Sequence, residues 1–305
     1  MINALETTQL SKRYGRHWAL QDCTLALPAG RVGALVGPNG AGKTTLLKTS
    51  VGLLTPTEGH VQVFGRSPVK HPTEALPRLG FVAQDCPLYK DFSVADLLTL
   101  GRKLNPRWDD HLARARMQKL GIPLDRRAGK LSGGQQAQIA LVLALAKRPD
   151  LLLLDEPLAS LDPLARREFL RTLLDATVEV GLTVLLSSHI IGDLERVCDY
   201  LIVLSASHVQ LAGDIQETLQ AHKRLIGPRQ DVEAIARTHT IIETSHTERQ
   251  STLLVRTNGP LSAPSWDVQE VSLEDIVLAY LGQQETELPS SSPLAQKQNG
   301  MEVVQ

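Results

Sequence analysis

A glycine-rich segment near the start of this 305-residue chain constrains its fold more than any other feature. The apolar run from Arg31 to Val36 is typical of a buried strand. It is followed directly by Gly37-Pro38-Asn39-Gly40-Ala41-Gly42-Lys43-Thr44-Thr45. Glycines let backbone N–H groups approach phosphate oxygens, and a helix after the loop directs its positive dipole end to the same place. The order strand, glycine loop, helix predicts a phosphate-binding loop rather than an ordinary glycine-rich turn.

Two side chains of this segment suit the chemistry of a nucleotide. Lys43 would neutralise charge on the β- and γ-phosphates, and the Thr44 hydroxyl would hold Mg²⁺. A phosphate loop alone fits kinases, GTPases and many ATPases, so a second signal has to discriminate between these classes.

An acidic pair ends a second apolar segment. Residues 151–154 are four leucines, a pattern typical of a strand inside a parallel sheet, and Asp155 and Glu156 follow them. Open α/β sheets bind ligands at this carboxyl edge. We expect Asp155 to bind Mg²⁺, directly or through water, and Glu156 to be the general base that activates a water molecule. Taken alone, the pair would also fit two solvated carboxylates.

A third motif, Leu131-Ser132-Gly133-Gly134-Gln135, opens a helix. Ser132 is a good N-cap residue, and the two glycines leave backbone N–H groups exposed at the helix N-terminus, which suits an anion. A capped helix start without a ligand is the alternative. Residues 139–146 are apolar on every side, so we expect this helix to be buried.

Together these motifs resemble the ATP-binding-cassette (ABC) family, whose signature sequence matches residues 131–135. The resemblance covers about residues 4–220. It implies an α/β fold: a P-loop NTPase core with an antiparallel β subdomain and a helical signature subdomain, followed here by a small α+β C-terminal domain. It also implies that Ser132, Gly133, Gly134 and Gln135 contact the γ-phosphate of ATP held by another copy.

The resemblance alone implies roles for four further residues. Tyr14 would stack on adenine, with a packing tyrosine as the alternative. Gln84 would sense Mg²⁺ and couple to a membrane partner. Asp162, in Ser160-Leu161-Asp162, matches a loop that communicates between two ATP sites, although it could simply cap the next helix. His189 matches the histidine that contacts the γ-phosphate.

Two positions depart from the family pattern. Gln138 is uncharged where many relatives have a basic residue, which puts in doubt any salt bridge made there. Leu158 stands where a threonine is common. Neither change removes a group with a proposed chemical role.

Composition divides the chain into three parts. We expect an ATP-binding cassette domain over residues 1–221, with its helical subdomain at about 92–148, and an accessory C-terminal domain over 222–282. The second part should contain helices near 231–237 and 273–281 and strands near 240–244 and 252–255. Residues 283–305 are rich in Gln, Ser, Pro and Glu, so we expect a disordered tail.

Charge and hydropathy restrict partners and location. Hydrophobic residues make up 42% of the chain and charged residues 21%, as in globular proteins. The net charge of -1 gives no attraction to nucleic acid, so none is expected as partner. Three dispersed cysteines, at positions 23, 86 and 198, fit a reducing compartment. Neither a secretory signal nor a membrane-spanning stretch is recognisable. We expect a cytoplasmic protein bound to the inner face of the membrane through a permease.

The function implied is that of an ATPase subunit that dimerises around ATP and Mg²⁺, with a second copy or a homologue, and powers a transmembrane permease. Residues 105–109, Asn-Pro-Arg-Trp-Asp, and the short C-terminal domain resemble a subgroup of bacterial exporter ATPases, so export is the expected direction. The alternatives are a soluble ABC ATPase of translation or DNA repair and a regulatory protein with a degenerate ATP site.

Overall fold

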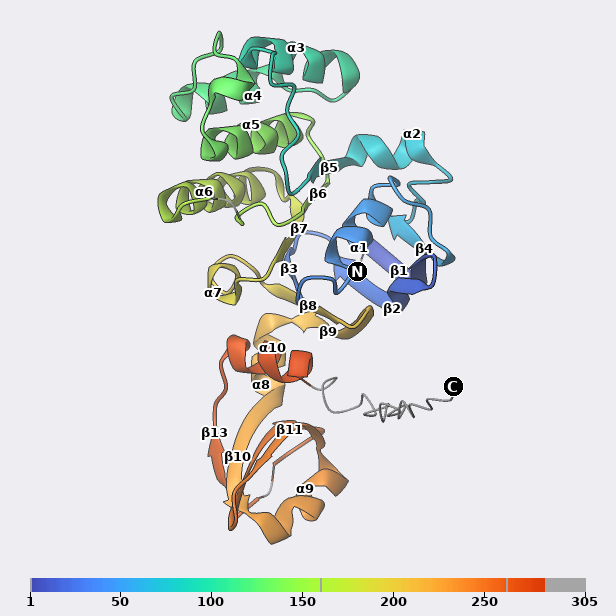
Figure 1. Cartoon of the computed structure of the whole chain (residues 1–305), viewed down its shortest axis with the longest axis vertical. Coiled ribbons are helices and arrows are strands. Elements are labelled where there is room, and N and C mark those ends of the chain that lie inside the picture. The colour runs from blue at the N-terminus through green and yellow to red at the C-terminus, as the bar shows by residue number, and fades with distance from the viewer. Residues whose placement is uncertain (1, 160, 262, 283–305) are drawn as a thin grey trace, which may run out of the picture.

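The computed structural model describes residues 2–159, 161–261 and 263–282. The expected disordered tail, 283–305, lies outside these residues, and so does Ser160. Figure 1 shows three tiers along the long axis: a group of helices, a central sheet flanked by a smaller one, and a further sheet near the C-terminus.

A six-stranded sheet forms the centre, in the order β5-β6-β7-β3-β8-β9. Its first five strands run parallel, and β9 is antiparallel to β8. The strands are β3 (Val32–Val36), β5 (Leu79–Val82), β6 (Leu151–Leu154), β7 (Thr183–Ser188), β8 (Tyr200–Ser205) and β9 (His208–Asp214). The strands expected from the leucine run and from the run before the glycine loop are thus confirmed.

Alternate residues of β6 pack on opposite faces of the central sheet. Leu151 and Leu153 join one apolar cluster with α1 (Lys43–Ser50), and Leu152 and Leu154 join another with α6 (Pro163–Val180). All four leucines are buried, because helices and a second sheet cover the two faces.

The second sheet is antiparallel, with the order β2-β1-β4, and lies beside α1 (Figure 1). It consists of β1 (Asn3–Tyr14), β2 (His17–Pro28) and β4 (Glu58–Val63). The short helix α2 (Pro72–Ala75) and a 3₁₀ turn (Leu76–Arg78) lead from it into β5. This sheet is the antiparallel β subdomain that the family resemblance implied.

Three helices form a lobe at one end of the molecule: α3 (Val94–Leu104), α4 (Asp110–Lys119) and α5 (Gly133–Ala146). Their shared core includes Leu98, Met117 and Ile139, all buried. A 3₁₀ turn (Ala128–Lys130) precedes the signature residues. Ser93 and Ser132 each form a capping box with the third helical residue, and Ser132 is the N-cap that the sequence predicted.

The C-terminal elements form a four-stranded sheet in the order β11-β12-β10-β13. They are α8 (Ile215–Ala221), β10 (His222–Pro228), a 3₁₀ turn (Arg229–Asp231), α9 (Val232–Thr238), β11 (Thr240–His246), β12 (Gln250–Arg256), β13 (Asp267–Gln269) and α10 (Leu273–Gly282). The sequence predicted α9, α10, β11 and β12 but not α8, β10 and β13.

The helix α10 returns from this sheet to the central one. It contacts β8, β11 and the short helix α7 (Ile191–Leu194). Its residues Ile276 and Val277 are buried in the same apolar cluster as Leu201 of β8 and Ile242 of β11. The two parts of the chain therefore share a core, and the division at residue 221 stays a prediction.

Within the described part of the chain, none of the helices combines the length and the apolar character that crossing a bilayer requires.

Candidate functional site

The glycine loop lies between β3 and α1 and surrounds the Lys43 ammonium. A Cβ at Gly37 would lie 2.1 Å from the Leu204 carbonyl oxygen, so only glycine fits there. Gly42 has φ of +106° and caps α1. Lys43 Nζ donates hydrogen bonds to the carbonyl oxygens of Gly37 (2.7 Å) and Pro38 (3.2 Å). The ammonium is thus held inside the loop, with 6% of the residue exposed.

The carboxyl ends of β6 and β7 place two polar groups beside the start of α1. Asp155 follows β6 and is 1% exposed. Its Oδ1 accepts hydrogen bonds from Thr44 Oγ1 (3.0 Å) and from Ser187 Oγ (3.1 Å). Thr44 and Asp155, which were predicted as metal ligands from separate motifs, therefore meet at one point.

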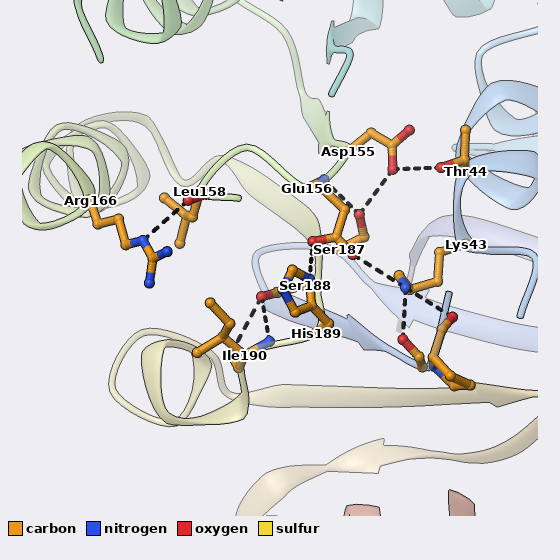
Figure 2. Close-up of polar contacts among 12 residues, drawn as sticks. Lys43, Thr44, Asp155, Glu156, Leu158, Arg166, Ser187, Ser188, His189 and Ile190 are labelled. Atoms are coloured by element: carbon orange, nitrogen blue, oxygen red, sulfur yellow. Dashed lines mark hydrogen bonds and ion pairs between the residues drawn. The ribbon is translucent and has the colours of Figure 1, made fainter. Parts of the chain in front are cut away.

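Glu156 lies between a lysine and a histidine, as Figure 2 shows. Its Oε2 is 2.8 Å from His189 Nδ1, and its Oε1 is 3.2 Å from Lys43 Nζ. The second contact is an ion pair without good hydrogen-bond geometry, and Oε1 accepts no hydrogen bond among the described residues. A carboxylate oxygen that is buried and free of hydrogen bonds suits a general base, because it can still accept a proton from water.

The backbone of Glu156 is strained. Its φ of +46° lies in the left-handed region, which costs a residue with a side chain about 1–3 kcal/mol. The Glu156 N–H donates to Ser187 Oγ at 2.8 Å, which helps to hold this conformation. Strain of this kind is concentrated at functional sites.

Lys43, Thr44 and Glu156 line one cavity of about 470 Å³, whereas Asp155 and His189 are not among its described lining residues. The lining residues from the predicted set are Pro38, Asn39, Gly40, Gly42, Lys43, Thr44, Thr45, Gln84 and Glu156. Gln84 comes from the loop after β5 and faces the same space as Glu156. Ala41 is buried beneath the loop, and its N–H donates to the Pro38 carbonyl at 3.2 Å. The arrangement offers cationic, hydroxyl and carboxylate groups around a volume that suits a phosphate chain.

The sequence reading missed three residues of this region. His17 and Ala19, at the start of β2, line the cavity, whereas Tyr14 does not and is 48% exposed. Tyr14 pairs with His17 across the turn, and Lys12 Nζ lies 5.5 Å from the centre of its ring. The third residue is Ser187, two positions before His189. No local sequence signal separates it from other serines, since its partners belong to another strand.

Comparison with known proteins identifies the family. Residues 20–159 match the family model described as ABC transporter. The sulfate/thiosulfate import ATP-binding protein CysA of Shigella flexneri is 34% identical over 218 residues, which are 68% of this chain and 60% of the relative. The CysA protein of Yersinia pseudotuberculosis is also 34% identical, over 70% of this chain and 61% of its own length. The chain thus spans about three fifths of these curated relatives.

Solved structures agree with the sequence comparisons. A structure described as the ATP-binding subunit of an ABC transporter matches with a TM-score of 0.65 and 26% identity, over 71% of this chain and 92% of the other. The cbiO1 protein of Clostridium perfringens, described as part of the ABC transporter complex cbiONQ, gives 0.63 and 25%, over 78% and 96%. This chain belongs to the ABC transporter family through its ATP-binding domain.

In this cassette, the signature residues lie apart from the phosphate loop of the same chain. Ser132 caps α5 by accepting a hydrogen bond from Gln135 N at 3.2 Å, and Gln135 Oε1 accepts from Ser132 N. The described residues that line the 470 Å³ cavity all come from outside 132–135. Gly133 instead lines a neighbouring hollow with Gln84. Contact of Ser132, Gly133, Gly134 and Gln135 with a nucleotide on another copy stays a prediction.

Asp162 caps the long helix α6 of the cassette. Its Oδ1 accepts hydrogen bonds from Leu164 N (3.0 Å) and Ala165 N (2.9 Å). The capping alternative is thus part of the structure, and a role of Asp162 in communication between two sites stays a prediction.

The loop after β5 also carries a shielded thiol. Burial raises the pKa of Cys86, and the neighbouring Asp85 charge acts in the same direction. Cys86 therefore stays a neutral thiol near neutral pH, beside Gln84 in the same loop.

Proposed function

We propose that this chain is the ATP-hydrolysing subunit of an ABC transporter. Two copies, or this chain and a homologue, hold two ATP molecules between the phosphate loop of one subunit and the signature residues of the other. The observation that carries this proposal is Glu156, placed between Lys43 and His189 in the cavity that Thr44 also lines.

The residues of the cavity have separate tasks in this mechanism. Lys43 and the loop N–H groups bind the phosphates, while Glu156 orients and deprotonates the attacking water. The ion pair between Lys43 and Glu156 gives the site a resting arrangement. When phosphate oxygens replace the Glu156 carboxylate as the partner of Lys43, that carboxylate would become available to water.

The oxygens present suit Mg²⁺. Thr44 Oγ1 and Asp155 Oδ1 are 3.0 Å apart, and Gln84 lines the same cavity as Thr44. Mg²⁺ is usually bound by one or two carboxylates together with substrate phosphates, which matches this donor set. Thr44, Asp155 and Gln84 would hold the ion, whose chemistry is to neutralise charge on the β- and γ-phosphates.

A groove next to Gln84 supports a permease as partner. It has a volume of about 630 Å³ and runs between the central sheet and the helical lobe. Its lining is mostly apolar and includes Leu53, Leu76, Phe81, Leu88 and Leu143. The Gln84 loop borders both this groove and the nucleotide cavity. A movement of this loop when the nucleotide changes would therefore be transmitted to a permease helix bound in the groove. The subunit would then act on the cytoplasmic face of the membrane.

The names of the sequence relatives bear on the direction of transport. Both curated relatives are named as import proteins, so the expectation of export, which rested on residues 105–109 and the short C-terminal domain, finds no support. Import is the direction that the relatives favour. A regulatory protein with a degenerate site is disfavoured, because Lys43, Gln84 and Glu156 line one cavity and His189 contacts Glu156.

The substitution Glu156→Gln tests the proposal. It keeps the shape of the side chain but removes the base, so ATP turnover should fall at least about tenfold while ATP still binds. An ATP-bound dimer should accumulate and be visible by size-exclusion chromatography with light scattering. Glu168→Gln, on the exposed surface of α6, is the control. Unchanged turnover, or a strictly monomeric ATP-saturated variant, would contradict the proposal.

A further inference from the structure

The segment Asn105-Pro106-Arg107-Trp108-Asp109, here called the NPRWD segment, connects α3 to α4 in the helical lobe. The proposed function gives it no task, although its composition is distinctive. Its side chains nevertheless contact the nucleotide-binding core at several points.

Arg107 reaches from the lobe to the start of the central sheet. Its guanidinium binds both carboxylate oxygens of Asp150, with Nη2 at 3.1 Å from Oδ1 and Nη1 at 3.4 Å from Oδ2. Arg78 binds the same carboxylate from the core side. A fork of this kind fixes direction as well as distance. Asp150 is therefore shared between one arginine of the lobe and one of the core.

Asp109 makes a second connection, to the end of α5. Its N–H donates to the Ala146 carbonyl at 2.7 Å, and its carboxylate accepts from Arg148 Nη2 at 2.6 Å. The same carboxylate caps α4 by accepting from Leu112 N. Arg148 has φ of +54°, so the chain turns sharply here between α5 and β6.

The NPRWD segment itself is held in a fixed shape. Asn105 Nδ2 donates to the Gly101 carbonyl at 2.8 Å. The Trp108 ring lies so close to Gly101 that a Cβ there would be 2.5 Å from it. Trp108 Nε1 also donates to Asp110 at 3.4 Å. A rigid segment transmits position better than a mobile one.

The residues that the NPRWD segment contacts lie at the ends of the helix and strands that carry the site residues. Arg78 directly precedes β5, which leads to Gln84, and Asp150 directly precedes β6, which leads to Glu156. The first residues of these strands, Leu79 and Leu151, are register partners. Arg148 and Ala146 mark the end of α5, whose opposite end is Ser132.

We propose that Arg107 is a positioning residue that sets the angle between the helical lobe and the catalytic sheet, and so places Ser132 for the nucleotide of a second subunit. The inference rests on the proposed function. With 14 residues, α5 is about 21 Å long. Loosening one end by about 5° would move Ser132 by about 2 Å, and a misplacement of about 1 Å can cost 10²-fold in rate.

The test compares Arg107→Met with Arg107→Lys and with Lys103→Met, an exposed cation of the same lobe. Arg107→Met keeps much of the apolar stem but removes the fork. ATP affinity should stay within about twofold, because no phosphate-loop contact changes, whereas turnover should fall by about tenfold or more. Arg107→Lys should be intermediate, since a point charge replaces a fork. Lys103→Met should match the parent chain.

Amide hydrogen exchange gives a readout that does not depend on turnover. The Asp109 amide should exchange faster in Arg107→Met, while the amide of Leu153 in β6 should keep its protection. Turnover within twofold of the parent, unchanged exchange at Asp109, or an equal loss of ATP affinity and turnover would each overturn the inference. A parent chain that hydrolyses no ATP would refute the proposed function instead, and the exchange experiment would still test the connection made by Arg107.

Discussion

Ser187 connects the two acidic residues of the site: its hydroxyl donates to Asp155 Oδ1 at 3.1 Å and accepts the N–H of Glu156 at 2.8 Å. One side chain on β7 thus orients the proposed metal ligand and stabilises the strained backbone of the proposed general base. Neither contact could be formed by a neighbour in sequence, because Ser187 reaches both residues only through the pairing of β6 with β7.

Ser187→Ala should therefore weaken both stability and catalysis. The substitution leaves the buried Glu156 N–H without its acceptor, which costs about 1–3 kcal/mol in the free energy of unfolding. Turnover should fall more than ATP affinity. Thr172→Val in α6 is the control, because among the described residues the Thr172 hydroxyl donates within its own helix, to the Glu168 carbonyl. Equal turnover in the two variants would contradict the role given to Ser187.

Gly37→Ala should abolish nucleotide binding or folding. The new Cβ would lie 2.1 Å from the backbone oxygen of Leu204, so the loop or β8 would have to move. Gly192→Ala offers a comparison, because a Cβ there meets no atom within 4 Å. Thermal unfolding and ATP titration of the two variants would show the difference. A Gly37→Ala chain that binds ATP normally would show that the loop is more open than described.

Gln138→Met should stabilise the protein. The Gln138 amide is 4% exposed, and neither its Nε2 nor its Oε1 has a hydrogen-bond partner among the described residues. Removing an unsatisfied buried amide should raise the free energy of unfolding by about 1 kcal/mol. Denaturant unfolding measures this change, and Gln136→Met, which loses the bond to the Leu131 carbonyl, should have the opposite sign. Destabilisation by Gln138→Met would show that the amide has a partner.

Stability should depend on pH through His222. Burial lowers the pKa of this histidine, whose Nδ1 contacts the Thr218 carbonyl and whose Nε2 contacts Tyr280 Oη. The unfolded chain then binds the proton more readily than the folded chain. The contribution of His222 to the free energy of unfolding should therefore be fully present above about pH 6.5, and it should be lost as the pH falls from about 6.5 toward the lowered pKa of the folded state. Unfolding at pH 7.5 and pH 5.5 measures the effect.

His222→Gln, which cannot be protonated, should reduce this pH dependence. His60→Gln, at an exposed position of β4, should retain the slope of the parent chain. An unaltered slope in His222→Gln would assign the pH dependence to other groups.

Local sequence signals predicted much of the core. The glycine loop, the leucine strand and the capped start of α5 each carry their signal within a few residues, so their positions could be read directly. The C-terminal strands β10 and β13 could not. Residues 222–228 mix charged and apolar side chains, and β13 has only three residues, so both depend on pairing with distant strands.

The sequence predicted which residues belong to the site better than it predicted how they are arranged. Lys43, Thr44 and Glu156 were named from motifs and Gln84 from the family resemblance, and the structure brings them to one cavity. The positive φ of Glu156 and its bond to Ser187 depend on the order of strands in the sheet, which no local pattern encodes. Likewise, the turn between β1 and β2 places His17 rather than Tyr14 at the wall of the cavity.

The return of α10 to the central sheet has a consequence for how the chain can be divided. A chain ending at residue 221 would leave Leu201 and its neighbours without the side chains of Ile276 and Val277 above them. We therefore expect that removing the C-terminal part would expose these apolar side chains and destabilise the central sheet. Heating the intact protein should melt both parts in a single calorimetric transition.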